Sequence, residues 1–207
     1  MKADIIVCGG GLGGFAATLA AARNGYKVIL TEETDWIGGQ LTQQGVPPDE
    51  HPWIETHGAP SSYRIFREGV RSYYKTHYPL TNEAKARKFL NPGDGVVSRL
   101  CHEPRVALEV LHAMLKPFIE NNHVILLLNH KVVEADASRD KVSALTIKNL
   151  LTNSSFNATA TYFVDATELG DLLPLTKTDY VTGAESNKET NELHAPSIGN
   201  PKNQQSF

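Results

Sequence analysis

Three glycines near the N-terminus have the spacing of a phosphate-binding loop. They form the pattern Gly9-x-Gly11-x-x-Gly14, between an apolar run and an alanine-rich run. The first glycine permits a tight turn, the second lets the backbone approach a pyrophosphate, and the third lets a helix pack closely on a strand. Glu32 follows at the end of the next apolar run, where a carboxylate can accept hydrogen bonds from ribose hydroxyls. The pattern predicts dinucleotide binding; the alternative is a tight turn without a ligand.

The runs around these residues predict the elements that position them. Asp4–Cys8 is a short apolar run with β-branched residues, and it predicts a buried strand. Leu12–Asn24 predicts a helix that ends at Gly25, and Tyr26–Thr31 predicts a second buried strand. A strand, a helix and a second strand in this order form the context that a dinucleotide-binding loop requires.

The remainder of the chain predicts further helices and strands around a long region without a core strand. Residues 33–100 contain several Pro and Gly residues, and the polar segment from Ser186 onward has no recognisable element. The predicted elements are a helix from Ser62 to about His77 capped by Ser61 or Ser62, a helix around Asn82–Phe89, a helix over Pro104–Asn121 with a kink at Pro117, a strand over His123–Leu128, a hairpin that turns at Ser138–Asp140, and a strand over Ala158–Val164.

Composition and charge narrow the class of protein. The 207 residues are 41% hydrophobic and 21% charged, as is usual for globular domains, and the net charge of −3 argues against a nucleic-acid partner. The apolar runs are too short to span a membrane, and the N-terminal run lacks a signal-peptide cleavage pattern. The two cysteines, Cys8 and Cys101, fit a reducing compartment. We therefore expect a cytoplasmic protein without a membrane partner.

Several later motifs resemble a known family. The order of Gly25, Val28, Glu32 and Gly38-Gly39 resembles the N-terminal signature of FAD-dependent oxidoreductases with the glutathione-reductase type of fold. The stretch DATELGD at 165–171 resembles the Ala-Thr-Gly element of these flavoproteins. Over residues 3–185 the chain is similar to a bacterial FAD-dependent oxidoreductase family of undefined substrate. That family is distantly related to tRNA-modifying flavoproteins of the glucose-inhibited-division-protein-A type.

The resemblance implies an α/β fold, namely a parallel-sheet Rossmann-type FAD-binding domain with a β-meander and an inserted helical and loop region. It divides the chain into four parts: the βαβ dinucleotide-binding unit at 1–39, the inserted region at 40–100, the remainder of the FAD-binding domain at 101–185, and a polar tail at 186–207. Members of the family continue past this length, so we expect the chain to be the N-terminal part of a longer flavoenzyme.

The resemblance also implies FAD as the cofactor and assigns residues to it. The pyrophosphate is cradled by Gly9, Gly11, Leu12, Gly13 and Gly14, and the adenosine ribose is held by Glu32. The remaining contacts are assigned to Gln40, Leu41 and Thr42 along the ribityl and pyrophosphate side, the Val132 backbone at the adenine edge, and Ala166 and Thr167 over the cofactor. Asp171 is either a further contact or a helix cap. Two departures are Glu33, where these flavoproteins usually carry Lys or Arg, and Glu168, where they carry the glycine of the Ala-Thr-Gly element.

The expected function is the FAD-binding part of an oxidoreductase that moves hydride or electrons between a small-molecule substrate and the flavin. One alternative is a non-catalytic dinucleotide-binding module, completed by a partner, by a missing C-terminal region or by self-association. A second alternative is a tRNA-modifying flavoprotein, which the net charge of −3 disfavours.

Other reactive side chains give weaker indications, and neither a catalytic residue nor a metal site is predicted. Cys101-His102-Glu103 lacks metal-ligand spacing and is interpreted as the lead-in to a helix. Histidines in the inserted region are interpreted as surface residues, with an acid–base role or a covalent attachment point for the flavin as the alternatives: His51, His57 and His77. Three arginines at helical spacing are interpreted as a solvated helix face, with an anionic substrate as the alternative: Arg64, Arg67 and Arg71.

Overall fold

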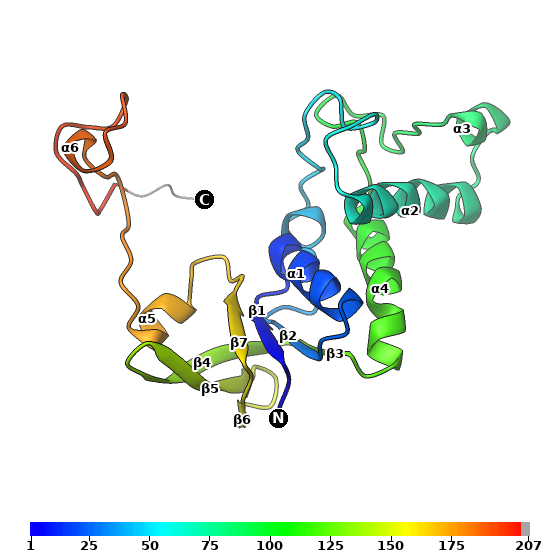
Figure 1. The fold of residues 1–207 in the computed structure, drawn as a ribbon. Helices are drawn as coiled ribbons and strands as arrows, with labels where there is room; N and C mark the ends of the chain where they lie inside the picture. Colours follow the sequence, from blue (N-terminus) through cyan, green and yellow to red (C-terminus); the bar gives the residue numbers. More distant parts are fainter. Residues whose placement is uncertain (204–207) are drawn as a thin grey trace.

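A four-stranded parallel sheet lies at the centre of the fold. The computed structural model describes residues 1–203. The strands lie in the order β3 (Val124–Leu128), β2 (Val28–Glu32), β1 (Ile5–Cys8) and β7 (Tyr162–Asp165). Because all three neighbouring pairs are parallel, the four carboxyl ends meet at one edge of the sheet (Figure 1). In such sheets this edge is where ligands bind.

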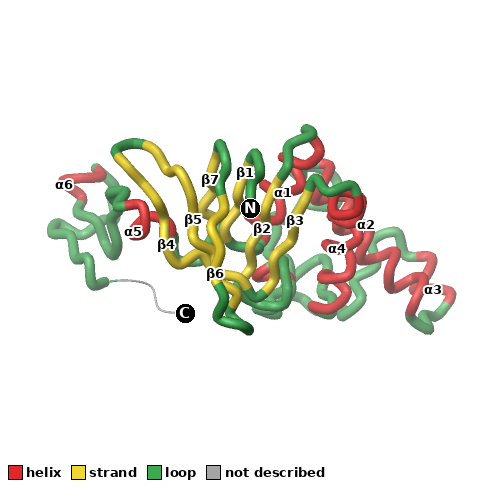
Figure 2. The backbone as a smooth tube through the Cα atoms, turned by 90° about the horizontal axis from the view of Figure 1, so that it is seen from below, coloured by secondary structure: helices red, strands yellow, loops and turns green. Residues whose placement is uncertain are grey.

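Helices cover one face of the sheet. Helices α1 (Leu12–Arg23) and α4 (Pro104–Glu120) pack on the strands, and α2 (Ser61–His77) crosses α4 farther out (Figure 1 and Figure 2). Their buried apolar side chains form one core with those of β1 and β2. Helices α2 and α4 cross closely, since a Cβ at Gly69 of α2 would lie 2.7 Å from Cγ1 of Val110 on α4.

An antiparallel meander covers the other face of the sheet. It consists of β4 (His130–Ser138), β5 (Lys141–Asn149) and β6 (Ser155–Ala158), and α5 (Leu172–Thr176) packs against β4. Ile6 and Cys8 of β1 point into the core on this side, whereas Val7 points into the helical core. This alternation is expected of a strand that is buried on both faces.

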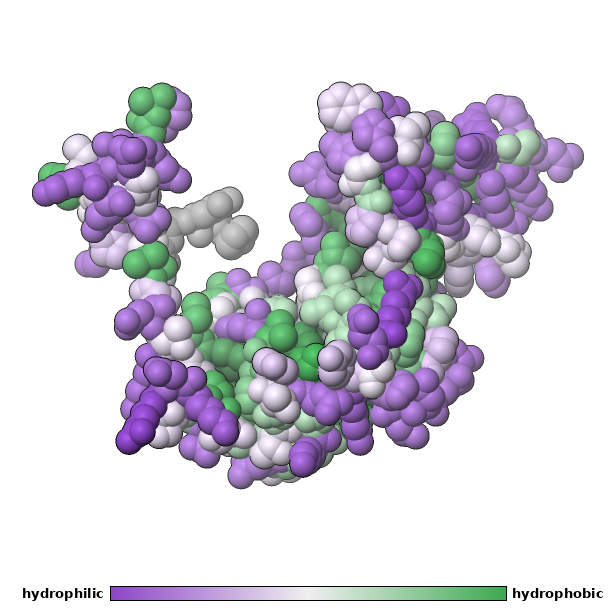
Figure 3. All heavy atoms as spheres, in the orientation of Figure 1, coloured by the Kyte–Doolittle hydropathy of each residue, from purple (hydrophilic) through white to green (hydrophobic). Residues whose placement is uncertain are grey.

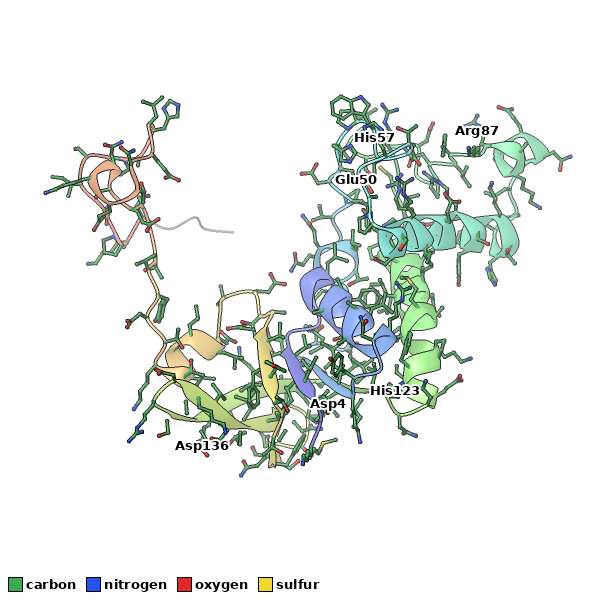
Figure 4. The ribbon with its side chains drawn as sticks, viewed as in Figure 1. Asp4, Glu50, His57, Arg87, His123 and Asp136 are labelled. Carbon is green, nitrogen blue, oxygen red and sulfur yellow. The ribbon has the colours of Figure 1, made fainter. Side chains whose placement is uncertain are left out.

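The inserted region extends outward from the carboxyl edge of β2, includes α2 and contains a buried ion-pair network. It includes the 3-10 turn η1 (Gly39–Leu41) and the short helix α3 (Asn82–Ala86). Arg67 and Arg71 are only 2% and 1% exposed, and they pair with Glu50 and Glu55. The interpretation of these two arginines as a solvated helix face is therefore wrong. Figure 4 shows Glu50 and His57 together at the far end of this region.

The segment after α5 leaves the sheet and forms a small structure of its own. Its helix α6 (Asn187–Thr190) begins with a capping box, in which Ser186 and Glu189 bond reciprocally. A bridge between Ala184 and Asn200 closes the segment on itself, and polar side chains cover most of its surface (Figure 3). The prediction of a featureless tail is wrong for its described part; residues 204–207 of that tail lie outside the described residues.

Other element predictions differ in detail from the structure. The predicted strand Ala158–Val164 is two elements, the end of β6 and the start of β7, separated by residues 159–161. The predicted helix Asn82–Phe89 ends at Ala86. Helix α2 has Pro60 at its N-cap position without a side-chain cap, so neither Ser61 nor Ser62 caps it. The hairpin turn at Ser138–Asp140 is confirmed by the pairing of β4 with β5.

Candidate functional site

Two glycines of the N-terminal loop are required by the fold itself. Gly9 has φ +96°, and its N–H donates to the Thr31 carbonyl at 3.0 Å. A Cβ at this position would overlap the carbonyl oxygen of Ala166 on the neighbouring segment. A Cβ at Gly14 would overlap the carbonyl oxygen of Gly9, so Gly14 lets α1 start directly against the turn.

Two further glycines of this loop, Gly11 and Gly13, face open space. A Cβ at Gly13 would meet nothing within 4 Å, and the nearest atom to a Cβ at Gly11 would be Oε1 of Glu168, at 3.4 Å. Gly11 has φ −57°, a value that any residue adopts. Packing in the described chain therefore does not explain these two glycines. The open space lies at the start of α1, whose N-cap position makes no side-chain hydrogen bond and whose first N–H groups lack helical acceptors.

Glu32 is a buried carboxylate held in one orientation at the carboxyl end of β2. The residue is 5% exposed. Its Oε2 accepts from the N–H of Gly10 at 2.8 Å, and its Oε1 accepts from the N–H and the hydroxyl of Thr34 at 2.8 and 2.7 Å. Because Oε2 accepts only one of these bonds, it can still accept a hydrogen bond from a ligand hydroxyl.

The Gly38-Gly39 pair lies directly beside the glycine loop. Gly38 has φ +106°, and its N–H donates to the Gly10 carbonyl at 2.8 Å. A Cβ at Gly39 would lie 3.1 Å from the Cα of Gly11. Of the three residues predicted to follow the cofactor here, Gln40 is exposed, while Leu41 and Thr42 are buried at 2% and 1%. The Thr42 hydroxyl donates to the Ile37 carbonyl at 2.7 Å and is thus used in the loop itself.

The segment after β7 closes the third side of the site. Asp165 accepts from the N–H and the hydroxyl of Thr167 at 3.0 and 2.7 Å, and from the N–H of Leu172 at 2.8 Å. The Ala166 N–H donates to the Cys8 carbonyl at 2.8 Å. These bonds hold residues 165–172 against the end of β1. Sequence reasoning missed the role of Asp165, although its position at the start of DATELGD was a signal.

A cleft at the carboxyl edge of the sheet brings many of these residues together. Six predicted residues line it: Gly9, Gly11, Glu32, Val132, Ala166 and Thr167. Six others do not line it: Leu12, Gly13, Gly14, Gln40, Leu41 and Thr42. Asp171, for which the sequence left a cofactor contact or a helix cap open, also lines the cleft. The lining further includes residues that the site prediction omitted: Cys8, Thr31, Glu33, Gln43, His130, Lys131 and Glu168.

Charge in the cleft is predominantly negative. Four carboxylates line it, and Lys131 of β4 is the only lysine or arginine among its described lining residues. The Nζ of Lys131 lies 2.8 Å from Asp171 and 3.2 Å from Glu33. The hydrogen bond to Asp171 raises the pKa of Lys131 above its usual value, so the lysine is charged at neutral pH. The Asp171 side chain makes this ion pair and does not cap α5.

The remaining reactive groups lie elsewhere or are inert. Cys8 is 1% exposed, and burial, together with the charge of Asp165, raises the pKa of its thiol to about 12. His51 and His57 flank the exposed ring of Trp53 in the inserted region. Within residues 1–203, the structure contains no group of three or more His, Cys, Asp or Glu side chains placed to hold a metal ion. No helix in this part of the chain has the length and apolar character needed to cross a membrane.

Comparison with known proteins matches the chain to a flavin-dependent family and to several solved structures. A family model described as FAD dependent oxidoreductase matches residues 4–205. The glycerol-3-phosphate dehydrogenase of Bacillus halodurans, solved with FAD, is similar with a TM-score of 0.55 at 16% identity. THI4 of Thermovibrio ammonificans is similar with a TM-score of 0.51 at 16% identity. The 4,4'-diaponeurosporene oxygenase of Staphylococcus aureus is 46% identical over 43 residues.

The shares of each protein that are covered set the scope of these similarities. The match covers 86% of this chain and 37% of the dehydrogenase, and 96% of this chain and 76% of THI4. The matched segment of the oxygenase is 21% of this chain and 9% of that protein. The chain thus spans about a third of the dehydrogenase and less than a tenth of the curated oxygenase. At these identities the solved structures show a shared fold.

Proposed function

Because the chain belongs to the FAD dependent oxidoreductase family, we propose that its cleft binds the adenosine-diphosphate half of FAD, and that the whole protein exchanges hydride or electrons between a small-molecule substrate and the flavin. FAD is the cofactor of this family, and the parallel sheet with its glycine loop is a fold of FAD-binding proteins. We propose both the class of substrate and the residues that contact FAD.

The open space at Gly11, which lines the cleft, is the observation that carries the assignment. A glycine that the fold does not require, at the start of a helix with free N–H groups, leaves room for an anion to approach the backbone. Glu32 stands at the end of the next strand, with its carboxylate held by Gly10 and Thr34. An anion-binding backbone and an acceptor for hydroxyls are the two features that an adenosine diphosphate needs.

The other contacts follow from the order of elements along the cleft. The backbone of Val132 at the start of the meander would face the adenine edge, and Ala166 with Thr167 would lie along the diphosphate. Since the side chains of Leu41 and Thr42 are buried, the segment after Gly39 would approach FAD through its backbone and through Gln40. The isoalloxazine ring of FAD supplies the redox chemistry. The role of these residues is to hold and orient the cofactor.

Identification of the bound nucleotide tests this proposal. The purified protein is expected to show the visible absorption of a flavin. After denaturation, chromatography of the released cofactor is expected to recover FAD. A protein supplied without cofactor should regain the spectrum when FAD is added. Recovery of NAD without any flavin, or a folded protein that binds neither, would overturn the proposal.

A further inference from the structure

The side chain of Glu168 reaches over the glycine loop. Its Oε1 would lie 3.4 Å from a Cβ at Gly11 and 3.6 Å from a Cβ at Gly39. The side-chain amide of Gln44 donates to the same oxygen at 3.3 Å. Segments far apart in the sequence therefore place one carboxylate in the space that the glycines leave open.

The backbone around Glu168 is fixed on both sides, and this presents the side chain to the loop. Thr167 precedes it and is bonded to Asp165 through both its N–H and its hydroxyl. Gly170, two residues after Glu168, has φ +69°. The N–H of Asp171 donates to the Thr167 hydroxyl at 2.7 Å. The turn is therefore closed on itself, and movement of Glu168 is confined mainly to its side chain.

The position of this carboxylate conflicts with a bound anion. The start of α1 attracts negative charge, so the Glu168 carboxylate occupies a favourable place when no ligand is bound. A pyrophosphate that approaches Gly11 would meet this like charge. Lys131, the only lysine or arginine among the described cleft residues, already pairs with Glu33 and Asp171. The repulsion is therefore not cancelled by a free cation in the cleft.

We propose that Glu168 is a specificity-determining residue, whose carboxylate competes with the ligand anion at Gly11 and selects the internal pyrophosphate of a dinucleotide against nucleotides that end in a phosphate. The inference rests on the proposed function of the cleft. A terminal phosphate carries about 1.5 to 2 negative charges at neutral pH, more than each phosphate of an internal pyrophosphate. A carboxylate at this position therefore repels ADP more strongly than FAD.

The test compares ligand affinities of the cofactor-free protein and three variants by calorimetric titration. Glu168→Gln removes the charge and Glu168→Ala removes the side chain, while Glu192→Gln removes one charge from the exposed tail as a matched control. The probes are FAD, ADP and adenosine, which has no phosphate. We expect both Glu168 variants to bind FAD about two- to fivefold more tightly and ADP roughly five- to tenfold more tightly. Adenosine affinity should stay unchanged, as should all affinities of Glu192→Gln.

Each remaining outcome counts against the inference. If Glu168→Gln bound FAD and ADP no more tightly than the wild-type protein does, the inference would be overturned. It would also be overturned if the affinity for adenosine rose as much as the affinities for FAD and ADP, because the effect would then not depend on the ligand anion. An equal gain for FAD and ADP would overturn the selection between them. If the folded wild-type protein bound adenosine and ADP but not FAD, the proposed function would fail separately.

Discussion

Lys131 and Asp171 join two elements across the mouth of the cleft, with 2.8 Å between Nζ and Oδ2. Lys131 lies on β4 of the meander, and Asp171 immediately precedes α5. The same Nζ reaches Glu33, which directly follows β2, at 3.2 Å. One cation therefore connects the meander, the parallel sheet and the turn that presents Glu168. The Lys131 ammonium compensates part of the negative charge of Glu33.

Replacement of Lys131 by Met is expected to have a small effect on stability. The side chains of Lys131 and Asp171 are 39% and 27% exposed, so the loss in free energy of unfolding should be at most about 1 kcal/mol. The pKa of Lys131 is raised in the folded protein, so its stabilisation is present below the usual lysine pKa and is lost as the pH rises through the raised value. Urea unfolding should therefore show a constant difference between wild type and variant from neutral pH to about pH 10, and a shrinking difference above it. A difference that grows above pH 10 would contradict this ion pair.

Valine at Gly11 and valine at Gly14 should fail for different reasons. A side chain at Gly11 meets only the mobile end of Glu168, so Gly11→Val should fold with a near-normal urea midpoint and yet lose FAD. A side chain at Gly14 overlaps the carbonyl of Gly9, so Gly14→Val should fail to fold. Circular dichroism and FAD retention measure the two properties, with Ala16→Val on the exposed side of α1 as the control. A Gly11→Val protein that retains FAD would remove the pyrophosphate assignment.

Removal of the Glu32 carboxylate should weaken FAD binding by less than Gly11→Val does. Charged hydrogen bonds contribute about 1.5–3 kcal/mol, which corresponds to a loss of roughly 10- to 150-fold in affinity for Glu32→Ala. The Gly10 N–H also loses its buried acceptor, so the variant should unfold more easily by about 1–3 kcal/mol. Titration at low temperature separates the two effects. Glu33→Ala is the matched control, and an equal loss of affinity there would contradict a specific role for Glu32.

The sequence was most informative where one local signal dictates one structure. The glycine spacing and the apolar runs around it predicted β1, α1 and β2, because a buried strand, a turn and a helix each have a local pattern. The position of Glu32 at the end of β2 was predicted for the same reason. The separation of β6 from β7 could not be predicted from the sequence, because nothing in Ala158–Val164 marks a boundary between two strands. The boundary depends on the pairing of β6 with β5 and of β7 with β1.

Charge was the property that the sequence described least well. Arg67 and Arg71 have the spacing of a solvated face, but both pair with carboxylates of the loop at 50–55, and Arg71 also contacts the segment at 89–90. Lys131 and Glu168 were not recognised as cleft residues, since their partners come from distant segments. Long-range ion pairs leave no periodic trace in a sequence. These side chains are therefore visible only after the elements are assembled.

The thiol of Cys8 should be unreactive in the folded protein although it lies on the cleft wall. It is 1% exposed, and its pKa is raised to about 12, so almost no thiolate exists at pH 8. In a Cys101→Ala variant, which leaves Cys8 as the only thiol, a thiol-reactive dye should react slowly until urea is added. Rapid labelling without denaturant would show that the carboxyl edge of β1 opens in solution.

The buried arginines of the inserted region should stabilise the protein more than exposed ones do. Arg71 donates to Glu55 through two nitrogens and to the Leu90 carbonyl at 3.0 Å, while its residue is 1% exposed. Arg71→Ala leaves the Glu55 carboxylate with less compensation and opens a cavity, and it should lower the free energy of unfolding by about 3–5 kcal/mol. Arg87→Ala is the matched control, because Arg87 pairs with Glu83 on the exposed surface, where an ion pair contributes little to stability.

Urea unfolding of the two arginine variants measures this difference. In a Trp36→Phe background, fluorescence of Trp53, which lies in the same region, reports its local order. If the network only holds the inserted region in place, Arg71→Ala should shift the Trp53 signal to lower urea than the main far-ultraviolet circular dichroism transition, which follows all the helices and strands. Coincident transitions with a large loss would mean that the inserted region and the sheet unfold as one unit. A loss no larger than that of Arg87→Ala would contradict a stabilising role for the network.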